Sequence, residues 1–284
     1  MATHLNVLVT GASSGIGRAV AVELAGRGHT VFAAARREAA LEELAATHPG
    51  IAAAPMDVTD EDSIARAFKL IDSTTDGTGV DVLVNAAGFA LTGPIETLSI
   101  QEVKRQFDTN VFGLLAVTRA ALPSMRARRA GRLINISSVV GRTSFPAMGV
   151  YGATKYAVEA LSDALRMELA PAGIKVVLIE PGFVATDIVG ASMRERDGAA
   201  SPATESQDAY APLIGGAEKF LDKQMKRAMP AAALARTIAD AAEAHRPRTR
   251  YLAPLSAKGL VAVFTRLPDR IADAAKLRAI TGAA

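Results

Sequence analysis

Short runs of apolar residues alternate along the chain with longer amphipathic stretches. The apolar runs predict buried strands at 5–10, 30–35, 51–56, 80–85, 132–137 and 175–180, with a seventh candidate at 249–253. Helical spacing between the runs predicts helices at 18–27, 37–47, 60–72, 99–125, 151–170 and 229–244. Repeated strand–helix units favour an α/β fold with right-handed crossovers. We therefore expect a doubly wound parallel sheet of about seven strands, with helices on both faces.

Two segments depart from this pattern, although we expect residues 1–284 to form a single domain. Residues 187–229 are rich in glycine, alanine, serine, proline and charge. They follow the sixth strand, where open sheets bind ligands, and favour a substrate lid with short helices. A variable surface loop is the alternative. The C-terminal extension, about 254–284, contains Leu260, Val261, Val263 and Phe264. These could close an apolar substrate pocket, pair with another subunit, contact a membrane surface or pack in the core.

Composition narrows the classes of function. Half of the residues are apolar and the net charge is only +3, which is weak support for nucleic-acid binding. The basic clusters at 126–132 and 245–250 lack interleaved aromatics, so we interpret them as solvated faces. The four histidines show no metal-ligand spacing, and there is no cysteine. No uncharged apolar stretch approaches a membrane span and no leader pattern is seen, so we expect a cytoplasmic protein.

Three glycines lie between the first predicted strand and its helix, in the spacing Gly-x-x-x-Gly-x-Gly. Glycines in such a turn let backbone N–H groups approach a pyrophosphate at the positive end of a helix. We therefore expect a dinucleotide site here, formed by Gly11, Ser13, Ser14, Gly15, Ile16 and Gly17. A tight turn without a ligand is the alternative, because the spacing differs from Gly-x-Gly-x-x-Gly.

Ser138, Tyr151 and Lys155 indicate the chemistry. Tyr151 and Lys155 stand four residues apart, so they share a helix face. A nearby ammonium favours phenolate, so we expect Lys155 to lower the pKa of Tyr151 and make it a proton donor and acceptor near neutral pH. Ser138 follows the fifth predicted strand and could hold a carbonyl oxygen against the phenol. These are the groups of a carbonyl–alcohol redox site, provided that a hydride carrier binds.

The end of the second predicted strand bears on the choice of carrier. NAD sites place a carboxylate there for the ribose hydroxyls, but this chain has Ala35, followed by Arg36 and Arg37. Guanidinium groups bind phosphate in a fork, so we expect NADP(H), with NAD(H) as the second choice. Arg36 is the stronger candidate for direct contact. The alternative is that both arginines begin a solvated helix.

These pieces together resemble the short-chain dehydrogenase/reductase family, over about residues 5–190. The matching motifs are Thr10-Gly11-x3-Gly15-x-Gly17, Asp57-Val58, Asn85-Ala86-Ala87-Gly88, Asn110, Ser138, Tyr151-x3-Lys155 and Pro181-Gly182-x3-Thr186. The resemblance implies a Rossmann-type fold. Ala-Arg-Arg after the second strand is also similar to the branch of retinol- and 17β-hydroxysteroid-dehydrogenase-like enzymes.

The resemblance implies a role for each matching residue. Lys155 would also bind the cofactor ribose, Asn110 would hold a proton-relay water near Lys155, and the family spacing favours Ser138 over Ser137 as the substrate-orienting residue. Cofactor contacts would come from Asp57, Val58, Asn85, Ala86, Gly88, Tyr151, Lys155, Pro181, Gly182, Val184 and Thr186. Ala86 replaces the second asparagine of the family's Asn-Asn-Ala-Gly, which puts the local cofactor geometry in doubt.

The sequence thus predicts an NADP(H)-dependent oxidoreductase that interconverts a carbonyl and an alcohol on an apolar substrate, which the branch suggests is retinoid-, steroid- or lipid-like. The alternative is a catalytically silent protein that senses NADP(H) on the same fold. A homodimer or homotetramer is expected by analogy, through the helices predicted at 99–125 and 151–170. No metal, nucleic acid or membrane span is expected.

Overall fold

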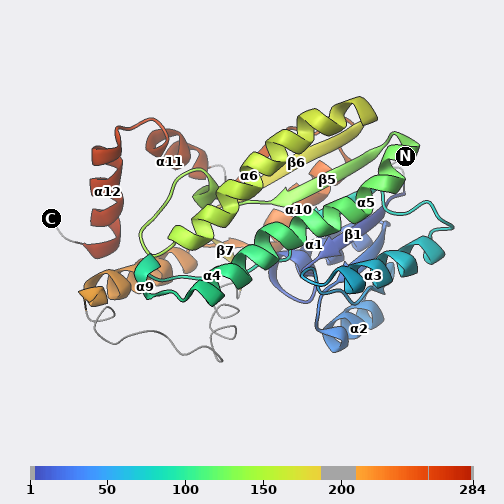
Figure 1. Cartoon of the computed structure of the whole chain (residues 1–284), viewed down its shortest axis with the longest axis horizontal. Helices are drawn as coiled ribbons and strands as arrows, with labels where there is room; N and C mark the ends of the chain where they lie inside the picture. The colour runs from blue at the N-terminus through green and yellow to red at the C-terminus, as the bar shows by residue number, and fades with distance from the viewer. Residues whose placement is uncertain (1–3, 187–208, 255, 283–284) are drawn as a thin grey trace.

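A sheet of seven parallel strands runs through the molecule, in the order β3-β2-β1-β4-β5-β6-β9 (Figure 1). The computed structural model describes residues 4–186, 209–254 and 256–282. The strands are β1 (Asn6–Thr10), β2 (Thr30–Ala34), β3 (Ile51–Ala53), β4 (Val82–Asn85), β5 (Gly131–Ile136), β6 (Ile174–Pro181) and β9 (Arg250–Ala253). The predicted doubly wound sheet is confirmed, and the candidate strand at 249–253 is its last member. The direction of winding reverses between β1 and β4, where such sheets bind ligands.

Helices cover both faces of the sheet because alternate strand residues are buried on opposite sides. Val7 and Val9 belong to the cluster that includes residues of α1, α2 and α10, whereas Leu8 belongs to the cluster that includes residues of α3, α5 and α6. Burial on both faces explains the uninterrupted apolar runs. The helices of the two layers are α1 (Gly15–Gly26), α2 (Glu38–Thr47), α3 (Glu61–Thr74), α5 (Leu114–Arg128), α6 (Gly149–Leu169) and α10 (Ala231–Glu243).

The bounds of most predicted elements differ from those observed by up to three residues. β3 ends at Ala53 rather than at residue 56. Pro55 has no N–H to donate and interrupts the regular pairing, although Met56 N still bonds to Ala35 O at 3.0 Å. The helical region at 99–125, predicted as one or two helices, is divided into α4 (Ile100–Phe107) and α5 by a π-helical turn, Asp108–Gly113, which contains Asn110.

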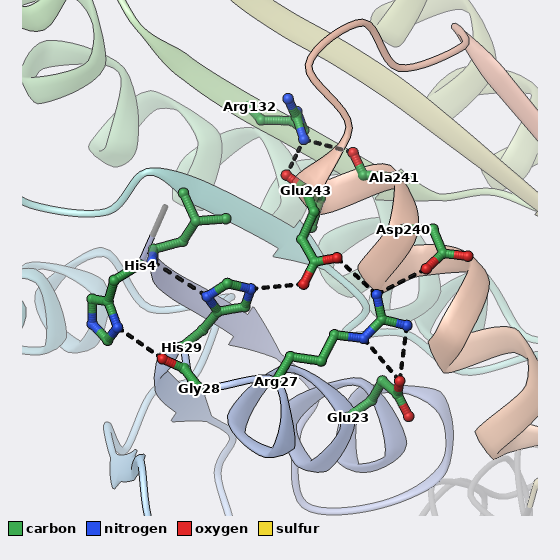
Figure 2. A network of polar contacts seen from close by, with 11 residues as sticks. His4, Glu23, Arg27, Gly28, His29, Arg132, Asp240, Ala241 and Glu243 are labelled. Carbon is green, nitrogen blue, oxygen red and sulfur yellow. Dashed lines mark hydrogen bonds and ion pairs between the residues drawn. The ribbon is translucent and has the colours of Figure 1, made fainter. Parts of the chain in front are cut away.

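Ion pairs tie α10 to α1 (Figure 2). Arg27 at the end of α1 lies 2.8 Å from both Asp240 and Glu243 of α10. Arg132 of β5 donates to backbone carbonyls at the end of α10, including Ala241 O at 2.7 Å. Because α1 and α10 end at the amino edge of the parallel sheet, these contacts secure that edge and leave the carboxyl edge for a site.

The C-terminal extension and the described part of the predicted lid form further helices. They are α9 (Ala211–Met225), α11 (Ser256–Phe264) and α12 (Asp269–Thr281), and α12 packs against α9. α9 has fifteen residues, so short helices alone do not describe this segment. Residues 187–208 of the predicted lid lie outside the described residues. Among the helices that the structure describes, none is long and apolar enough to cross a membrane.

Candidate active site

The turn between β1 and α1 has a geometry that requires glycine. Gly11 and Gly15 have φ of +69° and +55°, which other residues rarely adopt. A Cβ on Gly17 would lie 2.4 Å from the carbonyl oxygen of Gly11. The turn therefore brings two of its backbone segments into close contact, and its outer side is open to a ligand.

The first turn of α1 keeps its N–H groups available for an anion. Its N-cap Ser14 makes no side-chain capping bond, and the turn holds no acidic residue. Arg37 donates to both Ser13 O and Ser13 Oγ at 3.1 Å, which adds positive charge beside the turn. Unsatisfied N–H groups at a helix N-terminus suit a phosphate, so these residues fit the pyrophosphate of a dinucleotide.

The segment after β6 converges on the same turn. A Cβ on Gly15 would lie 3.4 Å from Thr186 Cβ, and Val184 is buried in the same cluster as Ala12. Pro181 O accepts a hydrogen bond of 3.3 Å from Ser138 Oγ. β7 (Val184–Ala185) pairs with β8 (Met229–Pro230) and fixes this segment. Pro181, Gly182, Val184 and Thr186 thus connect the glycine turn to Ser138.

A cavity of about 700 Å³ lies beyond the ends of β2 and β3. Its lining includes the predicted residues Arg36 and Val58, together with Thr59, Glu61, Phe89, Arg105, Asp108, Thr109, Phe112, Gly113, Leu115, Ala116 and Arg119. Ala35 at the end of β2 is buried, and Arg36 is exposed. Asp57 accepts hydrogen bonds from Thr59 N and Oγ1 at 2.9 and 2.7 Å, which fixes the loop beside the cavity.

Arg105 and Arg119 were not singled out from the sequence. They come from α4 and α5, far along the chain from Arg36, yet all three line this cavity. The only available signal was that the two arginines flank the motif containing Asn110. The three arginines outnumber the two carboxylates of the lining, Glu61 and Asp108, so the cavity is suited to an anionic nucleotide.

The loop after β4 is held from inside the protein. Asn85 Nδ2 donates to Thr118 Oγ1 at 3.0 Å and to Asn135 Oδ1 at 2.9 Å. The side chain of Asn85 thus supports the sheet, and its predicted contact with the cofactor stays a prediction. The N–H groups of Ala86 and Ala87 both donate to Thr10 Oγ1 at 3.0 Å, so the backbone after β4 is fixed without the asparagine that Ala86 replaces.

Asn110 connects three parts of the site. Its Oδ1 accepts from Phe89 N at 3.1 Å, and its Nδ2 donates to Phe89 O at 2.9 Å and to Thr154 Oγ1 at 3.2 Å. A Cβ on Gly88 would lie 2.9 Å from Asn110 Oδ1. The π-helical turn therefore directs this amide toward the loop after β4 and toward α6; such turns are frequent at functional sites. The predicted relay water near Lys155 stays a prediction.

Ser138, Tyr151 and Lys155 meet where β5 ends and α6 begins. The hydroxyl of Ser138 interacts with the phenol of Tyr151, and Lys155 Nζ lies 5.6 Å from the centroid of the tyrosine ring. Lys155 Nζ also donates to Ile136 O at 2.8 Å. All three residues are buried. The hydroxyl of Ser137 faces Glu159 instead, so Ser138 is the serine beside Tyr151.

Burial has the largest effect on the pKa values of Tyr151 and Lys155. It raises the pKa of Tyr151 to about 12, opposed only by the hydrogen bond from Ser138. Burial also lowers the pKa of Lys155 to about 8, opposed by the charge of Glu159. The prediction that Lys155 lowers the pKa of the phenol is therefore wrong for the chain alone, because removal of water from the hydroxyl outweighs the nearby charge.

A partly buried ionic network lies behind Lys155 and was not predicted from the sequence. Glu159 follows Lys155 by one helical turn and pairs with Arg250 of β9, with Nη2 3.1 Å from Oε2. Arg250 also pairs with Glu180 at 3.1 Å and with Asp163 at 2.7 Å. The spacing of Glu159 from Lys155 was a signal, but nothing in the sequence connected it to Arg250.

Comparison with known proteins places this geometry in a family. The sequence model described as short chain dehydrogenase matches residues 5–197. A probable short-chain type dehydrogenase/reductase, VdlC, of Helicobacter pylori is 34% identical, over 92% of this chain and 93% of the relative. An NADPH-dependent 3-dehydrocapnine reductase of Ornithobacterium rhinotracheale is 33% identical, over 94% of each chain. Human retinol dehydrogenase 16 is 35% identical, over 94% of this chain and 86% of the relative.

Solved structures agree with the fold. A short-chain dehydrogenase from Streptomyces avermitilis has a TM-score of 0.79 and 34% identity, over 93% of this chain and 92% of that chain. A serine dehydrogenase complexed with NADP+ has a TM-score of 0.72 and 29% identity, over 87% and 93%. A dehydrogenase from Burkholderia phymatum in complex with NAD has a TM-score of 0.77 and 27% identity, over 92% of both chains. The chain therefore belongs to the short-chain dehydrogenase/reductase family of nicotinamide-dependent oxidoreductases, with the predicted similarity to its retinol-dehydrogenase-like branch.

Proposed function

We propose that the chain is an NADP(H)-dependent oxidoreductase that interconverts a carbonyl and an alcohol, with Tyr151 as general acid and base. The observation that carries this proposal is the buried contact of Ser138, Tyr151 and Lys155 at the carboxyl edge of the sheet. A hydroxyl, a phenol and an ammonium are positioned there around the place where a substrate oxygen can bind.

Each residue has one task in this proposal. Ser138 Oγ orients the substrate oxygen, and Tyr151 Oη gives it a proton in reduction or accepts its proton in oxidation. Lys155 binds cofactor ribose hydroxyls and stabilises the phenolate. Asn110 holds the loop at Phe89 and a water for proton exchange. When bound, the nicotinamide supplies or accepts the hydride. A pKa of about 12 keeps Tyr151 protonated at neutral pH, which suits reduction.

The preference for NADP(H) rests on Arg36 and Arg37. No carboxylate occupies the end of β2, and Arg36 lines the cavity beyond it together with Arg105 and Arg119. A 2′-phosphate needs cationic partners of this kind, whereas an NAD site uses a carboxylate. One relative is NADPH-dependent and one structural neighbour binds NADP+, while another neighbour binds NAD. Activity should therefore be measured with both NADPH and NADH.

The surroundings of Tyr151 support an apolar substrate of the retinoid, steroid or lipid-like kind. Tyr151 lies in a cluster with Val139, Val140 and Val261, and Phe145 packs against it. Val261 comes from α11, so the apolar C-terminal segment contributes to the wall of the site. We further propose that residues 187–229 form the lid over it. Exposed Ile100, Phe112 and Met167 on the α4–α6 surface support a homodimer or homotetramer.

Substitution of Tyr151 by phenylalanine tests the proposal. We expect the Tyr151→Phe variant to bind NADPH like the wild type and to reduce carbonyl compounds about a hundredfold more slowly or worse, because the proton donor is gone. Tyr156→Phe is the matched control, since Tyr156 lies on the same helix and is 44% exposed. Equal turnover of Tyr151→Phe and wild type would refute the catalytic assignment. NADPH binding without turnover of any carbonyl by wild type would support the NADP(H)-sensing alternative.

A further inference from the structure

Lys276 of α12 is a buried lysine whose ammonium lies over two aromatic rings. The residue is only 8% exposed. Its Nζ lies 5.7 Å from the ring centroid of Phe145 and 5.4 Å from that of Phe264. The two rings meet edge to face, with centroids 6.1 Å apart. Among the residues that the structure describes, Lys276 has no hydrogen bond or ion pair.

The two rings connect Lys276 to the proposed active site. Phe145 lies in the loop between Ser138 and α6, and it packs against the cluster that contains Tyr151. Phe264 lies one turn after Val261 on α11, and Val261 belongs to the same cluster. Figure 1 shows α11 and α12 at the end of the molecule where this loop lies. One layer of aromatic side chains thus separates the ammonium from the surroundings of the phenol.

The chain itself does little to balance this charge. Contacts with ring faces attract an ammonium but do not neutralise its charge. Elsewhere the chain gives buried or half-buried cations several carboxylates, as for Arg250 with Glu159, Asp163 and Glu180. Lys276 has three N–H donors, and the rings cannot satisfy them as oxygen atoms would. The arrangement is therefore suited to an anionic ligand.

We infer that Lys276 binds an anionic group of the substrate. The substrate would then be an amphipathic carbonyl or alcohol compound, in which an apolar segment separates the reacting carbon from a carboxylate, phosphate or sulfonate. The valines and Phe145 would contact the apolar segment, and the ammonium would bind the charged end. This inference rests on the proposed function, because Tyr151 defines the end that reacts. It makes Lys276 a specificity-determining residue.

Matched pairs of substrates test the inference. Keto acids of increasing chain length are compared with their methyl esters, by kcat/KM with NADPH. We expect the wild type to prefer the acid about tenfold or more at the best chain length, as a charge-assisted hydrogen bond allows. Lys276→Met should bring the ratio close to one, and Lys276→Arg should keep part of it. Long-chain keto phosphates and keto sulfonates, tested in the same way, would identify the anionic group.

Lys258→Met is the control, because Lys258 is an exposed lysine of the neighbouring helix α11 and its loss changes the net charge equally. This variant should keep the wild-type preference. Wild type without preference for any of the anions, or an unchanged preference in Lys276→Met, would overturn the inference. If wild type reduces none of the acids or esters although it binds NADPH, the proposed function fails instead.

Binding without turnover supplies a second measurement. Octanoate should raise the thermal midpoint of the wild type more than octanol does at equal concentration, because only the carboxylate can pair with the ammonium. The difference should vanish in Lys276→Met and persist in Lys258→Met. Equal effects of octanoate and octanol on the wild type would contradict a carboxylate as the group that is bound.

Discussion

Arg250 of β9 and Glu159 of α6 form an ion pair, with Nη2 3.1 Å from Oε2, directly behind Lys155. The carboxylate of Glu159 is nearly buried and lies one helical turn from the lysine, whose charged form it favours. The last strand of the sheet is thereby connected to the helix that carries Tyr151. We conclude that the edge strand contributes to the electrostatics of the site without touching it.

Loss of Arg250 should destabilise the protein strongly. Glu180 keeps its contact with Arg142 at 3.0 Å, but Glu159 has no other cation within salt-bridge distance among the described residues. Leaving a buried charge without its partner costs about 3 kcal/mol or more, so Arg250→Met should lower the free energy of unfolding by this amount. Urea denaturation at neutral pH measures it. Arg248→Met, at an exposed neighbouring position, should change stability by less than about 0.5 kcal/mol.

The loss of stability in Arg250→Met should be smaller at acidic pH. Burial raises the pKa of Glu159, and Arg250 opposes the rise. Without Arg250 the pKa of the folded state rises further, so the folded state holds a proton that the unfolded state releases as pH increases. The deficit of Arg250→Met should therefore shrink as pH falls toward the range in which Glu159 is protonated. A deficit that is constant with pH would show that lost packing, rather than the unpaired carboxylate, is responsible.

The sheet and its order of elements were predictable because strands buried on both faces give continuous apolar runs. The contact of Tyr151 with Lys155 followed from their spacing of one helical turn. The pKa of Tyr151 could not be predicted in this way. The burial of Tyr151 depends on Val261, which reaches the site from a helix more than a hundred residues later. The local sequence pattern predicts which groups are adjacent, whereas tertiary packing determines how far those groups are exposed to water.

The environment of Lys276 shows the same limit. In the sequence it is one of several basic residues on an amphipathic segment, for which a solvated face is the ordinary interpretation. Its burial requires Phe145 and Phe264 to approach it from a loop and from another helix. Arg105 and Arg119 likewise line the cavity with Arg36 only through the folding of α4 and α5. Sites that combine residues from distant elements have no periodic sequence pattern from which they could be predicted.

Lys155 should make the free protein less stable than it would be with an apolar residue in its place. Its pKa is lowered to about 8 by burial, so below that pH a charge is held in the interior at a cost of about 3 kcal/mol. Lys155→Met removes this cost and loses the bond to Ile136 O, worth about 1 kcal/mol. The variant should therefore gain about 2 kcal/mol in unfolding free energy near neutral pH, while losing turnover.

The pH dependence of unfolding separates this effect from simple packing. Between about pH 8 and pH 10.5 the unfolded chain binds more protons at Lys155 than the folded chain does, so wild-type stability should rise with pH. The rise should be absent in Lys155→Met. Lys104→Met, at an exposed lysine of α4, should retain it. Since the pKa of Tyr151 is raised to about 12, its opposite contribution becomes large only above pH 10, and measurements between about pH 8 and pH 9 isolate the lysine.

Arg36 should decide between the two cofactors. It is exposed at the end of β2 and lines the cavity beside Val58, and the neighbouring Arg37 donates to Ser13 O. An aspartate there would repel a 2′-phosphate and accept hydrogen bonds from the ribose hydroxyls of NAD(H). Arg36→Asp should raise the KM for NADPH about tenfold to a hundredfold, as expected for a lost hydrogen bond to a charged group, and change the KM for NADH little. Arg236→Asp, at an exposed site on α10, controls for the change in net charge. Equal increases in both KM values would remove Arg36 from the phosphate site and leave Arg37, Arg105 and Arg119 as the residues to test.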